Sequence, residues 1–170
     1  EARFYILTDT HTKVASAMPK LLWLDPISRI IACEDLGDDG DFSDLYGDVE
    51  LSDNELRTAA TWLSNLHHLD FDNTAMESLT NRDMRTLNSE HMFYFPLQEG
   101  TGLDLNTITP GLEQEAKKLK GDSAYVKTVA ALGEIYLGDG DTLIHGDYFP
   151  GSWLRTTQGF RVIDPEFSFF

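Results

Sequence analysis

The spacing of apolar residues changes along this chain, and that change limits the possible folds more than any other feature of the sequence. Residues 20–25 (KLLWLD) and 29–34 (RIIACE) are short apolar runs on either side of a Pro-containing turn sequence, which predicts an antiparallel hairpin. The middle of the chain carries helical spacing, and residues 153–155 and 160–163 predict a second hairpin across the sequence TTQG. Short strands on both sides of a mostly helical middle predict an α+β fold.

The strongest helix signal begins at Ser52. Residues 52–55 (SDNE) form a capping-box pattern, in which the Ser hydroxyl and the Glu carboxylate satisfy free backbone amides at a helix start. The predicted helix extends to His68. Its apolar face is formed by Leu56, Ala59, Ala60, Leu63 and Leu66.

Further patterns predict the remaining elements. Helices are expected over residues 1–17 and 80–93, and a short one from Thr109-Pro110 onward. Another helix is capped by Asp122 or Ser123 and stopped by Gly138. Its apolar side consists of Val126, Val129, Ala130 and Ile135. A short strand is expected over residues 142–144.

The charge of the chain excludes some classes of partner. There are 13 Lys and Arg residues against 29 Asp and Glu residues, which gives a formal net charge of -16. This charge repels phosphate backbones and anionic lipid, so we expect neither a nucleic-acid partner nor a membrane partner. No apolar run is long enough to cross a membrane, and a single cysteine, Cys33, excludes an intramolecular disulfide. A reducing, cytoplasmic setting is therefore expected.

Part of the acidic charge lies in a Gly-rich and Asp-rich loop over residues 35–50. A calcium-binding loop of the EF-hand type is excluded, because aligning Gly40 with its sixth position puts Gly37 in the third and Tyr46 in the twelfth, where carboxyl ligands belong. Two interpretations stay open, a solvated loop or a patch that attracts a cationic acceptor. Its acidic residues are Asp38, Asp39, Asp41 and Asp44.

The chemistry concentrates in two stretches near the C-terminal end, residues 143–154 (LIHGDYFPGSWL) and 161–167 (RVIDPEF). Each carboxylate follows an apolar strand or lies in the loop after one, where a cleft commonly opens. Phosphoryl transfer needs such groups, because one carboxylate orients or takes the proton of the attacking hydroxyl and others hold Mg²⁺ against the phosphates.

These stretches resemble the HGD catalytic loop and the following metal-binding aspartate of the kinase-like small-molecule phosphotransferases. That family includes aminoglycoside phosphotransferases, choline kinases, fructosamine kinases and methylthioribose kinases. The resemblance implies that Asp147 is the catalytic-loop aspartate and that Asp164 holds Mg²⁺. Ser152 stands where most members carry a metal-binding Asn, and the DPE sequence makes Glu166 a second metal ligand. The Ser at position 152 and the DPE sequence both differ from the commoner family pattern, and together they resemble methylthioribose kinase.

The resemblance also implies an architecture. Residues 29–36 (RIIACEDL) look like the strand and hinge of the family, so adenine would be bound at Glu34, Asp35 and Leu36, through the backbone of the first and last of these. Residues 1–35 would then be a remnant of the N-lobe with the hinge, and residues 36–170 a mostly helical C-lobe of a protein-kinase-like fold. The family's phosphate-covering loop and strand lysine would precede residue 1, with Glu1 or a neighbour as the lysine's partner. We therefore expect an internal segment of a larger kinase, without measurable activity by itself.

The function implied is ATP-dependent and Mg²⁺-dependent phosphorylation of a hydroxyl of a small molecule, either a sugar such as methylthioribose or an aminoglycoside-like compound. A kinase-like domain that binds a nucleotide or a protein partner without catalysis is the alternative. His145 has a structural interpretation, in which it hydrogen-bonds the loop backbone, beside a ligand or base interpretation. His67 and His68 face different sides of a helix, which favours packing over a metal site.

Overall fold

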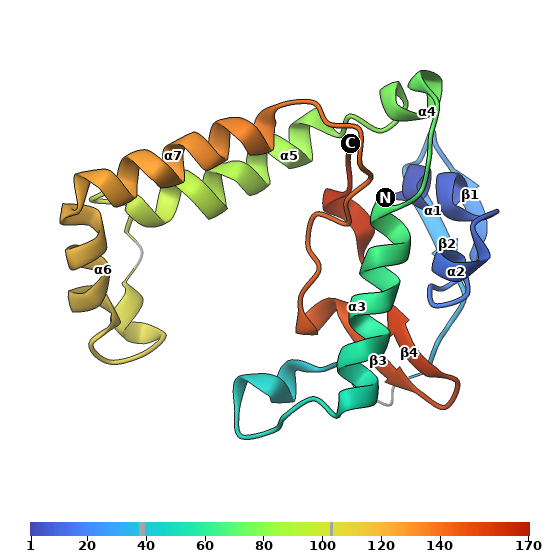
Figure 1. The fold of residues 1–170 in the computed structure, drawn as a ribbon, viewed down its shortest axis with the longest axis horizontal. Coiled ribbons are helices and arrows are strands. Elements are labelled where there is room, and N and C mark those ends of the chain that lie inside the picture. The colour runs from blue at the N-terminus through green and yellow to red at the C-terminus, as the bar shows by residue number, and fades with distance from the viewer. Residues whose placement is uncertain (38–39, 103) are drawn as a thin grey trace. The chain divides into compact units, whose positions relative to one another are not determined.

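A computed structural model describes residues 1–37, 40–102 and 104–170 of the chain (Figure 1). Helices and small antiparallel sheets alternate along it, which confirms the α+β class. The chain divides into two compact units, one formed by residues 1–81 with 140–170 and the other by residues 82–139. No helix within the described ranges is long and apolar enough to cross a membrane.

The first unit holds both predicted hairpins. Its helices and strands are α1 (Ala2–Thr8), α2 (Thr12–Ala15), β1 (Leu21–Asp25), β2 (Ile30–Cys33), α3 (Asp53–His67), α4 (Asn73–Glu77), β3 (Trp153–Thr156) and β4 (Gly159–Val162). Strand β1 pairs with β2 and β3 pairs with β4, both antiparallel. The Asp25 carboxylate accepts hydrogen bonds from the backbone N–H groups of Ile27 and Ser28, at 2.9 and 3.2 Å, which closes the first turn as its sequence predicts.

Helix α3 supplies much of the core of the first unit and begins with the predicted capping box. The Ser52 hydroxyl accepts from the Glu55 N–H at 3.3 Å, and the Glu55 carboxylate accepts from the Ser52 N–H at 2.9 Å. The predicted apolar face is wrong at Leu56, which is 56% exposed, and at Ala60, which is also exposed, because the face is rotated toward Trp62. The buried cluster around it contains Phe4, Val14, Leu66, Leu143 and Val162.

A single helix over residues 1–17 is not observed. The chain leaves helical geometry after α1, and α2 begins at Thr12 after His11, whose ψ of 78° is not helical. Tertiary packing explains the break, since Val14 must reach the same core as Phe4 while its carbonyl oxygen accepts a hydrogen bond from the Trp62 indole at 3.1 Å. Local helical spacing carries no information about that distant donor.

The strand predicted over residues 142–144 is also wrong. Only Ile144 pairs, in an isolated antiparallel bridge with Phe169, whose carbonyl oxygen accepts from the Ile144 N–H at 3.0 Å. Leu143 beside it is fully buried, so the apolar run is explained by core packing rather than by a ladder.

The second unit is helical. It contains α5 (Arg82–Ser89), a π-helical turn (Glu90–Tyr94), α6 (Leu112–Gly121) and α7 (Ser123–Leu137), and α5 lies against α7 (Figure 1). Asp122 caps the start of α7, where its carboxylate accepts from the N–H groups of Ala124 and Tyr125, and Gly138 follows the last residue of the helix as predicted.

Two details of the second unit differ from the prediction. Gly111, not Thr109, precedes the first turn of α6, because the Asn106 side-chain oxygen accepts from the Gly111 N–H at 3.0 Å and fixes the start there. Ile135 is 73% exposed, and the packed position of α7 is Gly133, which lies against Phe93 and Tyr94. A glycine allows that close approach but gives no apolar signal in the sequence.

Candidate active site

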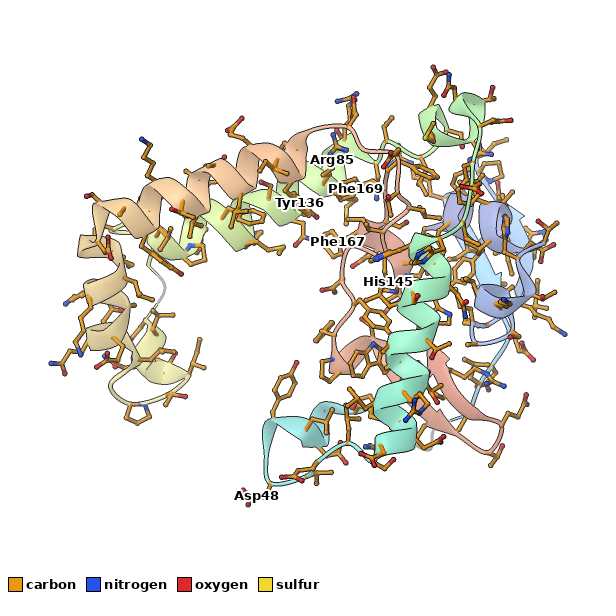
Figure 2. All side chains as sticks on the ribbon, in the orientation of Figure 1. Asp48, Arg85, Tyr136, His145, Phe167 and Phe169 are labelled. Atoms are coloured by element: carbon orange, nitrogen blue, oxygen red, sulfur yellow. The ribbon has the colours of Figure 1, made fainter. Side chains whose placement is uncertain are left out.

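The loop over residues 145–152 is anchored by His145. This side chain is buried beside α3, with its ring centroid 5.9 Å from that of Trp62 (Figure 2). The Asp147 backbone N–H donates to Nδ1 at 3.3 Å, so Nε2 carries the hydrogen and donates to the Ile163 carbonyl oxygen at 3.0 Å. Burial lowers the pKa of His145 to about 4, which keeps the ring neutral. The structural interpretation of His145 is confirmed.

Gly146 brings the loop against the segment that follows β4. Its φ is +85°, and an added Cβ atom would overlap the backbone carbonyl group of Phe167. Only glycine combines this conformation with so close an approach. His145 and Phe167, both labelled in Figure 2, mark these two segments.

Ser152 closes the other end of the loop. Its Oγ donates to the Asp147 carbonyl oxygen at 2.9 Å, and its own carbonyl oxygen accepts from the Ile163 N–H at 3.0 Å. The residue is buried. This hydrogen bond braces the loop, while metal binding by Ser152 stays a prediction.

Tyr148, the residue after Asp147, fastens the loop to α3. Its ring stacks on Trp62 with centroids 5.2 Å apart and planes 9° from parallel, and its hydroxyl donates to the Ala59 carbonyl oxygen at 2.9 Å. The sequence does not predict this role of Tyr148, because its only signal is an aromatic residue beside the acidic one. The backbone around Asp147 is therefore fixed by three side chains, those of His145, Ser152 and Tyr148.

The predicted carboxylates lie close enough to interact electrostatically. Asp164, in a left-handed conformation with φ of 58°, precedes the 3₁₀ turn Pro165–Phe167 that carries Glu166, and both side chains belong to exposed residues. Burial raises the pKa of Asp147, and the negative charge of Asp164 raises it further.

Glu1 joins this group of acidic side chains. Burial raises the pKa of Glu1, and the negative charges of Asp164 and Glu166 add to the rise. The resemblance implies that Glu1, or a neighbour, pairs with the strand lysine of the family. No basic side chain in the described ranges forms an ion pair with Glu1. None of the basic side chains that the structure describes thus forms an ion pair with this acidic group.

The chemistry of this group fits Mg²⁺ held jointly with a nucleotide. Carboxylate oxygens are the ligands that Mg²⁺ prefers, and in kinase-type sites one or two of them act together with phosphate oxygens and water. Among the described residues no set of three or more His, Cys, Asp or Glu side chains is arranged to enclose a metal. Metal binding by Asp164 and Glu166 stays a prediction.

The predicted adenine segment continues the pairing of the first hairpin. The Glu34 N–H donates to the Lys20 carbonyl oxygen at 2.8 Å, and its carboxylate accepts from the Lys20 N–H at 3.3 Å. Asp35 accepts from the Gly37 N–H at 2.8 Å. No hydrogen bond to another described residue uses the Glu34 carbonyl oxygen or the Leu36 N–H. Both groups belong to the backbone of the two residues that the prediction assigns to adenine, and adenine binding there stays a prediction.

The acidic loop is partly docked. Asp38 and Asp39 lie outside the described residues. Asp44 forms an ion pair with Arg155 at 3.1 Å, and Asp41 accepts from the Ser43 N–H at 2.9 Å. These two carboxylates therefore serve the local fold, and attraction of a cationic acceptor stays a prediction.

Several methylthioribose kinases are similar to this chain. The protein from Exiguobacterium sibiricum is 32% identical over 90 residues, which is 53% of this chain and 22% of that protein. The Bacillus pumilus protein is 28% identical over 95 residues, 56% of this chain and 23% of that protein. Methylthioribose kinase 1 of Oryza sativa subsp. japonica is 32% identical over 62 residues, 36% of this chain and 14% of that protein.

The chain thus matches less than a quarter of the length of these relatives. No family model matches it. The similarities support a relationship to small-molecule kinases over about half of the chain.

Proposed function

We propose that this chain carries the catalytic loop of an ATP-dependent phosphotransferase that phosphorylates a hydroxyl group of a small molecule. The observation that carries the proposal is the placement of Asp147. Its backbone is fixed by His145 and Ser152, and its carboxylate has a raised pKa beside Asp164. The similarity to methylthioribose kinases supports the same reaction class.

Asp147 would act as the general base. Its carboxylate accepts the proton of the acceptor hydroxyl as that oxygen forms a bond to the γ-phosphorus of ATP, and the bond to the bridging oxygen breaks to release ADP. A carboxylate whose pKa is raised by burial is a stronger base than one in water, provided that it is ionised at the working pH. Most of the acceleration would come from positioning.

Asp164 and Glu166 would hold Mg²⁺, with Ser152 as the further predicted ligand. The ion, when bound, neutralises charge on the β- and γ-phosphates. The Glu34 carbonyl oxygen and the Leu36 N–H would receive the adenine ring. In this division of roles the carboxylates bind the cation, and the backbone groups of Glu34 and Leu36 bind the adenine ring.

A sugar hydroxyl is the acceptor that we favour, of the methylthioribose type. The DPE sequence and the named relatives both support it. An amine-bearing acceptor would depend on the acidic loop, of which Asp44 is already paired with Arg155.

The proposal is tested by Asp147→Asn in the full-length protein, with Asp48→Asn as the matched control. Asp48 is exposed, at the tip of the loop labelled in Figure 2. Loss of the base should lower kcat by about 10²- to 10⁴-fold and leave the Kd for ATP nearly unchanged. Steady-state kinetics with methylthioribose and a panel of aminoglycosides, together with ATP titration, give both quantities. Full activity of the Asp147→Asn protein, or an equal loss of ATP binding, would count against the assignment.

A further inference from the structure

Asn81 contacts the segment over residues 164–168, called the acidic turn below because it carries Asp164 and Glu166. The two are more than 80 residues apart in the sequence. The side-chain Nδ2 of Asn81 donates to the carbonyl oxygen of Glu166 at 2.6 Å and to that of Ser168 at 3.0 Å. Its backbone has a φ of +43°, a left-handed conformation that Asn adopts more readily than most residues. One amide group thus bridges two carbonyl groups of the segment that carries Asp164 and Glu166.

The chemistry of these bonds fixes the orientation of the amide. Both partners are carbonyl oxygens, which only accept, so the NH₂ end of Asn81 must face them and both of its hydrogens are used. A hydroxyl has a single hydrogen and a carboxylate has none to donate. Asn therefore fits this position through its two donors as well as through its backbone conformation.

The segment that these two hydrogen bonds hold also contacts the catalytic loop. Phe167 lies between the two carbonyls that Asn81 binds, and its own carbonyl group contacts Gly146. The following Phe169 pairs with Ile144. Removal of the Asn81 amide would take away both of these hydrogen bonds, while the contact between Phe167 and Gly146 would stay.

We propose that Asn81 is a positioning residue, which fixes the backbone of the acidic turn so that Asp164 and Glu166 present their carboxylates to a divalent cation. The inference rests on the proposed function of these two residues. Asn81 does not touch the cation or the nucleotide. It acts through the carbonyl groups of Glu166 and Ser168, in the way that outer partners orient metal ligands in other proteins.

Two variants separate the amide from the backbone conformation. Asn81→Gly keeps the left-handed conformation without cost and removes both donors, whereas Asn81→Ala removes the donors and adds conformational strain. Asn73→Gly and Asn73→Ala, at the exposed first residue of α4, are the matched controls. All four are made in the full-length protein.

The measurement is the affinity for Mn²⁺ in the presence of ATP, followed by the electron paramagnetic resonance signal of free Mn²⁺, with urea unfolding in parallel. We expect both Asn81 variants to weaken Mn²⁺ binding by about tenfold. Neither Asn73 variant should change it. The urea curves show whether each variant is fully folded under the assay conditions, and only fully folded variants are compared, because an unfolded fraction would itself raise the apparent Kd.

Unchanged Mn²⁺ affinity in the Gly variant would overturn the inference, even if the Ala variant bound the ion less tightly, because backbone strain alone would then explain the effect. Absence of Mn²⁺-dependent ATP binding in the wild-type protein would overturn the proposed function and this inference with it. Wild-type binding that both Asn81 variants retain would overturn the inference and leave the proposed function standing.

Discussion

The hydroxyl of Ser152 donates a hydrogen bond to the backbone carbonyl oxygen of Asp147, at 2.9 Å. The bond joins the two ends of the turn that follows the acidic residue. Ser152 is also bound through its carbonyl oxygen to the N–H of Ile163, immediately before Asp164. One buried serine thus links the backbone of the proposed base to the segment that bears the proposed metal ligand.

Because of this hydrogen bond, we expect alanine substitution of Ser152 to lower the free energy of unfolding more than alanine substitution of the buried Ser168. Ser152→Ala leaves the Asp147 carbonyl group without its donor and should lower the free energy of unfolding by about 1–2 kcal/mol. Ser168→Ala removes a fully buried hydroxyl that has no hydrogen-bond partner among the described residues, so it should be neutral or stabilising. Urea unfolding of both variants gives the comparison. Equal losses would mean that the Ser152 bond contributes nothing beyond packing.

Signals contained within a few neighbouring residues predicted the structure well. The Ser52 and Glu55 capping box, the Asp25 turn and the Asp122 cap all appear as expected. Elements that depend on distant partners were predicted wrongly. The break before α2 depends on Trp62, and the start of α6 on the side chain of Asn106, neither of which has a signature in local spacing.

Gly146 and Gly159 offer a matched test of the contact between the loop and Phe167. Both have a positive φ, at +85° and +98°, but a Cβ atom at Gly159 would meet nothing within 4 Å. Gly159→Ala should therefore cost only the conformational term, about 1–2 kcal/mol. Gly146→Ala adds overlap with a backbone carbonyl group that cannot rotate away, and should cost more than about 3 kcal/mol. Similar losses in chemical denaturation would show that the two segments separate easily.

His145 predicts a dependence of stability on pH. Burial holds its pKa at about 4 in the folded protein, whereas the unfolded chain takes up the proton near its ordinary value of 6.5. The unfolded state then binds more protons between these values, so the free energy of unfolding falls as the pH falls. The loss through this group should be about 2 kcal/mol between about pH 7 and pH 5.

The measurement is urea unfolding of the wild type and of His145→Gln across this pH range. The Gln side chain does not titrate, so its variant should lose less stability on acidification, whatever its stability at neutral pH. The difference in slope isolates His145 from the acidic groups, since Asp147 and Glu1, with raised pKa values, contribute with the opposite sign in both proteins. Parallel pH profiles would mean that the ring becomes protonated without cost.

The order of the HGD and DPE sequences predicts that Asp147 and Asp164 belong to one site. The negative charge of Asp164 raises the pKa of Asp147, while their joint role stays a prediction. The contributions of Tyr148 and Asn81 could not be predicted, because each depends on a hydrogen bond to a backbone carbonyl group more than 80 residues away, of Ala59 and Glu166 respectively. Backbone carbonyl groups are identical at every residue, so the sequence does not mark them as partners.

Asp164 is expected to support ATP binding only when a divalent cation is present. The negative charge of Asp164 raises the pKa values of Asp147 and Glu1, and no basic side chain in the described residues forms an ion pair with these carboxylates. If Mg²⁺ offsets that charge, Asp164→Ala in the full-length protein should weaken ATP binding in Mg²⁺ by about tenfold or more. In EDTA the same variant should bind ATP as well as the wild type or better, because the substitution removes a charge that repels the phosphates. Isothermal titration in both buffers measures the two affinities, with Asp48→Ala as the control for lost negative charge at an exposed position. An equal loss in both buffers would assign Asp164 to the fold of the turn and not to the cation.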